Sequence, residues 1–296
     1  MAYNSLIVKK VLDYFDEKQF KKIKSVIDFG DQDLNLNFDD ISNLFKKKKI
    51  FFPEKKFYPL KKYPSRPRAP SSSLWLSLGL EVADRIDLKK IDREEINKSD
   101  GEVYELDLNF KHDDKKIIKN KKYDLVTDFG NNEHVFNIAE AYKLAHELCN
   151  KNGLIWIIQN IYGGNGLYNF DLSYFELLAA ANGYIIIDSF MIIVDNKERK
   201  MIPLDIDVFK KFNLNNLEEI QVSYLLKKQS DKNFIFPYQG IGNSSKRDKF
   251  YEMVDYANNR KNYNLKRFYL PRTIEQLDSK LLINELLKRI KKKLFK

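Results

Sequence analysis

The chain has 296 residues, of which 43% are hydrophobic and 14% aromatic, and it carries a formal net charge of +10. This hydrophobic share is too high for a disordered chain, and the length is sufficient for one full α/β domain. No run approaches the roughly 20 apolar residues of a membrane span, and residues 1–10 lack the pattern of a secretory signal. A single cysteine, Cys149, excludes an intrachain disulfide and a cysteine-based zinc cluster, so we expect a soluble, cytoplasmic protein.

The basic balance of the chain leaves a nucleic-acid partner open. Most of the lysines are scattered, however, and tight runs occur only at residues 46–49 and 291–293. Such runs are usually solvated surface, so we favour a small-molecule partner over nucleic acid.

The elements predicted for the first part of the chain are a helix over residues 6–23, a buried strand over 25–29 and a short helix over 39–45. Five prolines between residues 53 and 70 then exclude a regular helix, which predicts an insert or lid over about residues 46–73. From residue 73 onward, helices alternate with strands. We predict helices over 74–80, 132–150 and 172–181, strands over 81–86, 102–108, 123–127, 154–159, 184–194 and 221–228, and an irregular piece that contains 204–212.

This alternation predicts an α/β protein with a mostly parallel, doubly wound sheet. We place it in one domain over residues 1–232, followed by a C-terminal extension over 233–296. Within the extension, residues 273–296 intersperse leucines with lysines, which is typical of an amphipathic helix. That helix either packs on the body of the protein or binds a partner or an interface.

Polar residues follow four consecutive predicted strands. In an open parallel sheet, ligands bind beyond the carboxyl ends of the strands, where the strand order reverses. A carboxylate at the second strand end, such as Asp87, accepts hydrogen bonds from both hydroxyls of a ribose, which indicates a nucleoside ligand. The residues at the four strand ends are Asp28, Gly30 and Gln32; Asp87; Asp107 and Leu108; and Asp128, Glu133 and His134.

The turn after the first strand separates the possible cofactors. A dinucleotide needs a glycine-rich turn, whereas Gly30 is followed by Asp31 and Asp33 with no further glycine. Two acids repel phosphate and suit a cofactor with sulfonium and ammonium groups, namely S-adenosylmethionine. The Asp-Phe-Gly sequence at residues 128–130 lacks the other kinase motifs, so we discount a kinase.

Several motifs resemble, in the same order, a group of bacterial class I S-adenosylmethionine-dependent methyltransferases that is associated with surface-polysaccharide loci. The matching segments are residues 28–33 (DFGDQD), 104–109 (YELDLN), 123–137 (YDLVTDFGNNEHVFN), 165–175 (NGLYNFDLSYF) and 181–184 (ANGY). Residues 133–137 are the most specific part, and the match covers about residues 25–194. The resemblance implies a Rossmann-like sheet of seven strands whose last strand is antiparallel.

The resemblance also implies a role for each strand-end residue. Asp28, Gly30 and Gln32 would line the methionine end of S-adenosylmethionine, with Asp128 beside it. Asp87 would bind the ribose, Asp107 the adenine amino group, and Leu108 the ring. Glu133 and His134 would face the transferred methyl group. Because an imidazole titrates near neutral pH, His134 is the candidate general base.

The loop after the fifth strand carries glycines, aromatic residues and amides, which suit a sugar ring. Its candidate substrate residues are Tyr162, Asn165, Tyr168 and Asn169. We therefore expect O-methylation of a sugar or glycan-precursor hydroxyl, and no metal site. The alternatives are a nucleic-acid methyltransferase and a catalytically inactive binding subunit with the same fold.

Overall fold

The fold is a single sheet covered by helices on both faces. The computed structural model describes residues 3–17, 20–30, 32, 34–36, 38–51, 70–88, 101–110, 118, 120–195, 198–205 and 217–237. The strands are β1 Ser25–Phe29, β2 Val82–Asp87, β3 Val103–Glu105, β4 Tyr123–Phe129, β5 Cys149–Tyr162, β6 Ile185–Asp195, β7 Glu198–Pro203 and β8 Leu217–Lys227. The helices are α1 Ser5–Asp16, α2 Phe38–Lys47, α3 Ser71–Ser77, α4 Ile138–Leu148 and α5 Leu172–Asn182, with a 3-10 turn η3 over Asn132–His134.

The strands lie in the order β3-β2-β1-β4-β5-β8-β6-β7. Neighbouring strands from β3 to β5 are parallel, whereas β8 is antiparallel to both β5 and β6, and β7 is antiparallel to β6. The predicted α/β class, the mostly parallel doubly wound sheet and its antiparallel last strand are therefore confirmed. The sheet has eight strands rather than the seven predicted, because β7 forms an antiparallel pair with β6. Its sequence, ERKMIP, has neither strict alternation nor an apolar run.

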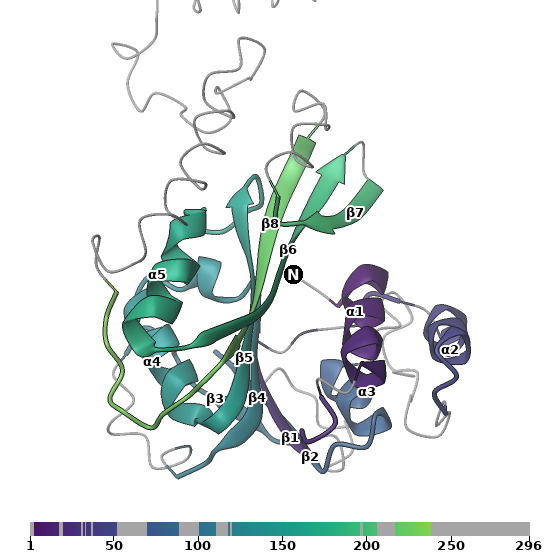
Figure 1. The fold of residues 1–296 in the computed structure, drawn as a ribbon, viewed down its shortest axis with the longest axis horizontal. Helices are drawn as coiled ribbons and strands as arrows, with labels where there is room; N and C mark the ends of the chain where they lie inside the picture. The colour runs from purple at the N-terminus through teal and green to yellow at the C-terminus, as the bar shows by residue number, and fades with distance from the viewer. Residues whose placement is uncertain are drawn as a thin grey trace, which may run out of the picture.

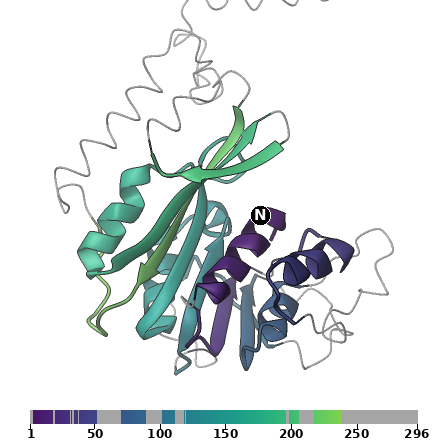
Figure 2. The same ribbon diagram turned by 45° about the vertical axis from the view of Figure 1, so that its right-hand side comes forward.

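Alternating side chains along the strands build one hydrophobic core on each face of the sheet. In β5, Trp156 and Ile158 belong to the core beneath α1 and α3, while Ile155 and Ile157 belong to the core beneath α4 and α5. Figures 1 and 2 show α1, α2 and α3 on one side of the sheet and α4 and α5 on the other. A strand buried on both faces needs a nearly continuous apolar run, and residues 155–158 of β5 supply one.

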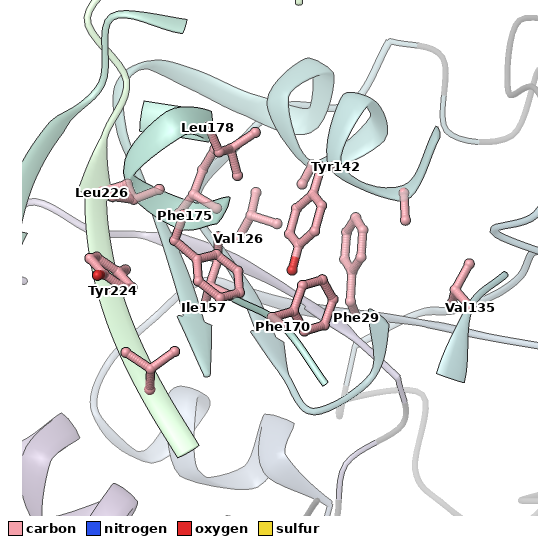
Figure 3. Packing of buried hydrophobic residues seen from close by; sticks show 14 of the residues in the cluster. Phe29, Val126, Val135, Tyr142, Ile157, Phe170, Phe175, Leu178, Tyr224 and Leu226 are labelled. Carbon is pink, nitrogen blue, oxygen red and sulfur yellow. The ribbon is translucent and has the colours of Figure 1, made fainter. Parts of the chain in front are cut away.

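Aromatic residues connect the loop after β5 to the core beneath α4 and α5. The ring of Phe170 lies 5.3 Å from that of Phe175 and 6.4 Å from that of Tyr142, measured between centroids. Figure 3 shows these three rings together between α4, α5 and the sheet. The backbone N–H of Phe170 also donates to the carbonyl of Asn160 at 2.8 Å. The end of this loop is therefore anchored on the sheet.

Three predicted elements are shorter or broken in the structure for local reasons. The helix predicted over 6–23 ends at Asp16, where the N–H of the C-cap residue Glu17 donates to the carbonyl of Asp13. The helix predicted over 132–150 consists of η3 and α4, because Val135 between them is extended (φ −96°, ψ 122°) and β5 already begins at Cys149. The strand predicted over 102–108 ends at Glu105, because the Asp107 side chain accepts the backbone N–H of Asn109 and closes a turn.

The predicted insert is helical at both of its ends. Lys46 and Lys47 belong to α2, and Ser71 to Ser73 form the first turn of α3. Residues 52–69 of the insert lie outside the described residues, as does the helix predicted over 273–296 in the C-terminal extension. None of the described helices is long and apolar enough to cross a membrane.

Candidate active site

The strand order reverses between β1 and β4, which both end in a glycine turn. Gly30 (φ +85°) and Gly130 (φ +70°) directly follow the two strands in the left-handed region that favours glycine. A Cβ atom on Gly30 would lie 2.8 Å from Oδ1 of Asn131 and 2.9 Å from Nε2 of Gln32. The chain therefore brings two amide side chains over the carboxyl end of β1, which is the expected ligand position in such a sheet.

Asp28 lies one residue before the end of β1 and is buried on the α1 and α3 side of the sheet. Its carboxylate accepts hydrogen bonds from the hydroxyls of Tyr3 (3.0 Å), Ser71 and Thr127. Burial raises the pKa of Asp28, and the three hydroxyl groups oppose that rise. The structure thus gives Asp28 partners within the protein, and its predicted contact with the methionine end stays a prediction.

Asp128 shapes the turn that leads from β4 to the candidate catalytic residues. Its Oδ1 accepts the backbone N–H groups of Asn131 (3.2 Å) and Asn132 (3.1 Å), and its Oδ2 accepts Nε2 of Gln159 at 2.6 Å. Burial raises the pKa of Asp128 to about 6 in spite of these hydrogen bonds. Asp128 therefore positions η3, which carries Glu133 and His134.

Glu133 is buried, whereas His134 next to it is exposed. Asn160 at the end of β5 binds the Glu133 carboxylate twice, from its backbone N–H to Oε2 (3.1 Å) and from Nδ2 to Oε1 (2.8 Å). Burial raises the pKa of Glu133 to about 7, because these bonds replace only part of the lost hydration. The His134 side chain is 45% exposed, and its Nε2 lies 3.5 Å from Oε1 of Glu133. Partial burial lowers the pKa of His134.

The glycine loop after β5 packs against Glu133 and Asn160. A Cβ on Gly164 would lie 2.3 Å from Nδ2 of Asn160, and one on Gly166 would lie 2.8 Å from Cβ of Glu133. The backbone N–H of Leu167 donates to the carbonyl of Glu133 at 2.7 Å. These glycines therefore allow the loop to approach Glu133 and Asn160 closely.

The remaining predicted cofactor residues lie at the ends of β2 and β3. Asp87 is half-buried, and its Oδ1 accepts the N–H of Leu88 at 2.6 Å. Asp107 is half-buried and Leu108 buried in the turn after β3. Asn109 in that turn accepts the backbone N–H of Asn137 at 2.9 Å and accepts its Nδ2 at 3.1 Å. The turns after β3 and η3, which belong to separate motifs in the sequence, are thus in contact.

A polar cavity of about 340 Å³ opens beside Glu133. It lies toward β7 and β8, on the side of the carboxyl edge away from β2 and β3, and the N-terminus of α1 contributes to it. Two carboxylates and one guanidinium line it, and Arg199 lies 4.0 Å from Glu219. The lining residues are Asn4, Asn35, Glu133, Asn160, Gly164, Asn165, Arg199, Glu219 and Gln221.

One of the four predicted substrate residues lines this cavity, namely Asn165. Tyr162 is buried in the core beneath α4 and α5, the Tyr168 hydroxyl donates to the carbonyl of Phe136 at 3.0 Å, and Asn169 is exposed. Five other lining residues carry no prediction from the sequence, namely Asn4, Asn160, Arg199, Glu219 and Gln221. Asn160 and Gln221 could have been selected from the sequence, because each is a polar residue inside a buried strand. Asn4 and Arg199 have no such distinguishing feature.

Among the residues that the structure describes, no group of three or more His, Cys, Asp or Glu side chains is placed to hold a metal ion. The candidate site is built from amides, carboxylates, one guanidinium and one imidazole. Together with the sheet order, it defines a Rossmann-like α/β protein with a polar cavity at the carboxyl edge of the sheet.

No protein-family model matches the chain, and no curated protein matches its sequence. Solved structures resemble it in fold at low identity. One is the O-methyltransferase from a trans-AT PKS multienzyme of Brevibacillus brevis in complex with S-adenosyl-L-homocysteine, at 13% identity and a TM-score of 0.42, covering 84% of this chain and 82% of that one. TehB from Haemophilus influenzae has 11% identity and a TM-score of 0.42, with coverage of 74% and 62%. The MycE methyltransferase from the mycinamycin biosynthetic pathway has 13% identity and a TM-score of 0.41, with coverage of 76% and 51%.

Proposed function

We propose that the chain is an S-adenosylmethionine-dependent methyltransferase that methylates a hydroxyl of a sugar or glycan precursor. One observation carries this proposal: a glycine turn, the half-buried carboxylate of Asp87 and the Glu133–His134 turn lie at the carboxyl ends of three neighbouring parallel strands, β1, β2 and β4. A role in polysaccharide biosynthesis and a cytoplasmic location belong to the same proposal and rest on the sequence.

The residues at this edge fit S-adenosylmethionine better than a dinucleotide. The N–H of Gly30 donates to the carbonyl of Ile86 at 2.9 Å, so it is not available to a phosphate. Asp87 supplies a carboxylate for a ribose, and Asp107 and Leu108 supply polar and apolar contacts for a base. Asn132, which is fully buried, has an Nδ2 atom without a hydrogen-bond partner among the described residues. Asp28, Gly30, Gln32 and Asp128 complete the proposed cofactor set.

When bound by the residues named above, S-adenosylmethionine would supply an electrophilic methyl group for in-line transfer to the acceptor oxygen, with S-adenosylhomocysteine as the leaving group. His134 accepts the hydroxyl proton. Its lowered pKa keeps the imidazole neutral, and therefore basic, at neutral pH. Oε1 of Glu133 lies 3.5 Å from Nε2 of His134, so this carboxyl group would orient the imidazole. Holding the acceptor in line is the larger task, since proximity and orientation supply roughly 7–11 kcal/mol.

The nucleic-acid and inactive-subunit alternatives are tested by the same measurements. The two carboxylates in the cavity disfavour a polyanion, which argues against nucleic acid. Binding of S-adenosylhomocysteine without transfer to any hydroxyl acceptor would indicate an inactive subunit. Binding of RNA or DNA that falls steeply with salt would indicate the nucleic-acid enzyme.

The decisive experiment is calorimetric titration of the full chain with S-adenosylhomocysteine, followed by transfer of labelled methyl groups to sugar acceptors. We expect Asp87→Ala to weaken binding at least about tenfold, because a hydrogen bond to a charged group contributes roughly 1.5–3 kcal/mol. Glu105→Ala, an exposed carboxylate on the neighbouring strand β3, is the matched control and should leave the affinity unchanged. Absence of binding to the unmodified protein would overturn the proposal.

A further inference from the structure

Three buried amide side chains that line the cavity beside Glu133 each leave one polar atom without a partner among the residues that the structure describes. These atoms are Nδ2 of Asn4, Oδ1 of Asn160 and Oε1 of Gln221. The three residues are 8%, 3% and 1% exposed, respectively, so bulk water does not hydrate them freely. They come from the N-terminus of α1, the end of β5 and the middle of β8, and so converge only in the folded chain.

The orientation of each amide is determined by its other polar atom. Oδ1 of Asn4 caps α1 by accepting the N–H groups of Leu6 (3.0 Å) and Ile7 (3.2 Å). Nδ2 of Asn160 donates to Glu133, and Nε2 of Gln221 donates to Glu219. A flip of any of these amides would break its existing bonds. One N–H donor and two carbonyl acceptors in fixed orientations therefore remain unpaired, among the described residues, in side chains that line the cavity.

Unsatisfied buried polar atoms are expensive for a folded protein, at about 1–3 kcal/mol each. Three of them around one cavity indicate that a ligand completes their hydrogen bonds. The cavity volume of about 340 Å³ lies within the range of small-molecule sites, which is roughly 300–1,000 Å³.

The donors and acceptors of the cavity select the chemistry of that ligand. The two amide carbonyls require donors, and Asn4 requires an acceptor. The carboxylates of Glu133 and Glu219 already have partners in Asn160, Gln221 and Arg199, and they can accept further hydrogen bonds. A phosphate ion offers mainly acceptors and is repelled by the carboxylates, and an apolar ligand satisfies none of these atoms. A hydroxyl both donates and accepts, so several hydroxyls on one molecule satisfy the whole set.

We infer that this cavity is the acceptor site for an uncharged, polyhydroxylated ring, and that Asn4, Asn160 and Gln221 determine its specificity. The inference rests on the proposed function, because the cavity is bordered by Glu133, whose Oε1 lies 3.5 Å from Nε2 of the proposed base His134; His134 is not itself a lining residue. The acceptor enters from the β7–β8 side of the sheet edge, whereas the proposed cofactor residues lie at the carboxyl ends of β1, β2, β3 and β4. The two ligands would then meet at the turn after β4.

The test is ligand-observed saturation-transfer NMR on the full chain with methyl α-glucoside, methyl α-mannoside and N-acetylglucosamine, in the presence of S-adenosylhomocysteine. The first variant, Asn4→Ser, keeps a helix-capping oxygen and removes the donor. The second, Gln221→Leu, removes the acceptor at similar volume. Asn182→Ser makes the same change as Asn4→Ser at the end of α5, where Asn182 bonds to Leu178 and Ile235.

We expect at least one sugar to bind the unmodified chain and the Asn182→Ser control equally, and to lose about fivefold or more of its signal in both cavity variants. Unchanged affinity for S-adenosylhomocysteine in those variants shows that they are folded; if Gln221→Leu does not fold, Asn4→Ser decides. The inference is overturned if no sugar binds, if binding survives in the folded cavity variants, or if inorganic phosphate displaces the sugar. Sugar binding that depends on the amides, in a chain that does not bind S-adenosylhomocysteine, would contradict the proposed function and leave the sugar site standing.

Discussion

Asn160 at the end of β5 binds both oxygens of the Glu133 carboxylate, through its backbone N–H and its side-chain amide. This clamp joins the turn after β4 to the neighbouring strand. It also keeps a carboxylate with a side-chain exposure of only 3% beside the cavity. Burying that negative charge costs free energy of folding, and this cost depends on pH.

Glu133→Gln should change how stability depends on pH. The folded-state pKa of Glu133, about 7, lies above the unfolded value near 4.5, so the folded protein binds this proton more tightly. Glu133 therefore contributes stability below about pH 4.5 that is lost as pH rises through 7. Relative to the unmodified protein, the Gln variant should gain on the order of 2 kcal/mol between pH 5 and pH 8. Urea unfolding at the two pH values measures this difference.

The control for this prediction is Glu147→Gln on α4, a 45%-exposed carboxylate paired with Lys143 at 3.7 Å. Exposed pairs contribute little, so its pH dependence should follow that of the unmodified protein. A Glu133→Gln variant with the same pH dependence as this control would show that the Glu133 carboxylate is not destabilised by its burial.

His134→Ala should lower kcat by about 10²–10⁴ while leaving the affinity for S-adenosylhomocysteine within a few-fold. Since the pKa of His134 is lowered, kcat/KM of the unmodified enzyme should be flat from pH 7 to 8.5 and fall only as the pH drops below the ordinary histidine range. The measurement is a pH–rate profile with a sugar acceptor. Unchanged turnover in His134→Ala would remove His134 from the mechanism. An inflection near pH 7 that disappears in Glu133→Gln would assign the base to Glu133.

Lys228→Met should destabilise the fold. Nζ of Lys228 donates to the carbonyls of His146 and Cys149, both at 2.9 Å, and lies 3.1 Å from Asp231. Its side chain is only 2% exposed, so methionine leaves two carbonyls at the end of α4 without this donor. We expect a loss of about 2–4 kcal/mol in the free energy of unfolding. Lys227→Met, at the neighbouring position, should change the free energy of unfolding by about 0.5 kcal/mol or less. An equal effect of both variants would contradict the stabilising role of the hydrogen bonds from Lys228 to the carbonyls of His146 and Cys149.

Two glycines with positive φ should respond differently to alanine. Gly183 (φ +63°) ends α5, and no atom lies within 4 Å of a Cβ placed there, so Gly183→Ala should cost only about 1–2 kcal/mol of backbone strain. A Cβ on Gly101 (φ +88°) would lie 1.9 Å from the carbonyl oxygen of Ala83 in β2. Gly101→Ala should therefore cost about 3 kcal/mol or more. Thermal unfolding of both variants compares them, and a smaller effect at Gly101 would contradict the close approach of this turn to β2.

Where the sequence predicted the structure well, the signal was local and repeated. Apolar runs such as Ile155 to Ile158 indicate strands buried on both faces, and their alternation with helices indicates the doubly wound sheet. The motif in residues 123–137 indicates Glu133 and His134 as candidate site residues through its resemblance alone. Strand β7 was not predicted, because it forms by pairing with β6 rather than through a strand pattern in its own sequence.

The sequence by itself determined the fold class, the buried strands and the polar residues at the strand ends. Both the hydrophobic periodicity of an element and the polar residues that follow it can be recognised from residues that are close together in the chain. Only the tertiary structure decided which polar groups are already paired and which face a cavity. Asp28 is held by three hydroxyls from distant segments, whereas Asn4, Asn160 and Gln221 meet around one open space. Hydrogen-bond satisfaction is a property of atoms brought together across the whole chain, so no local pattern reports it.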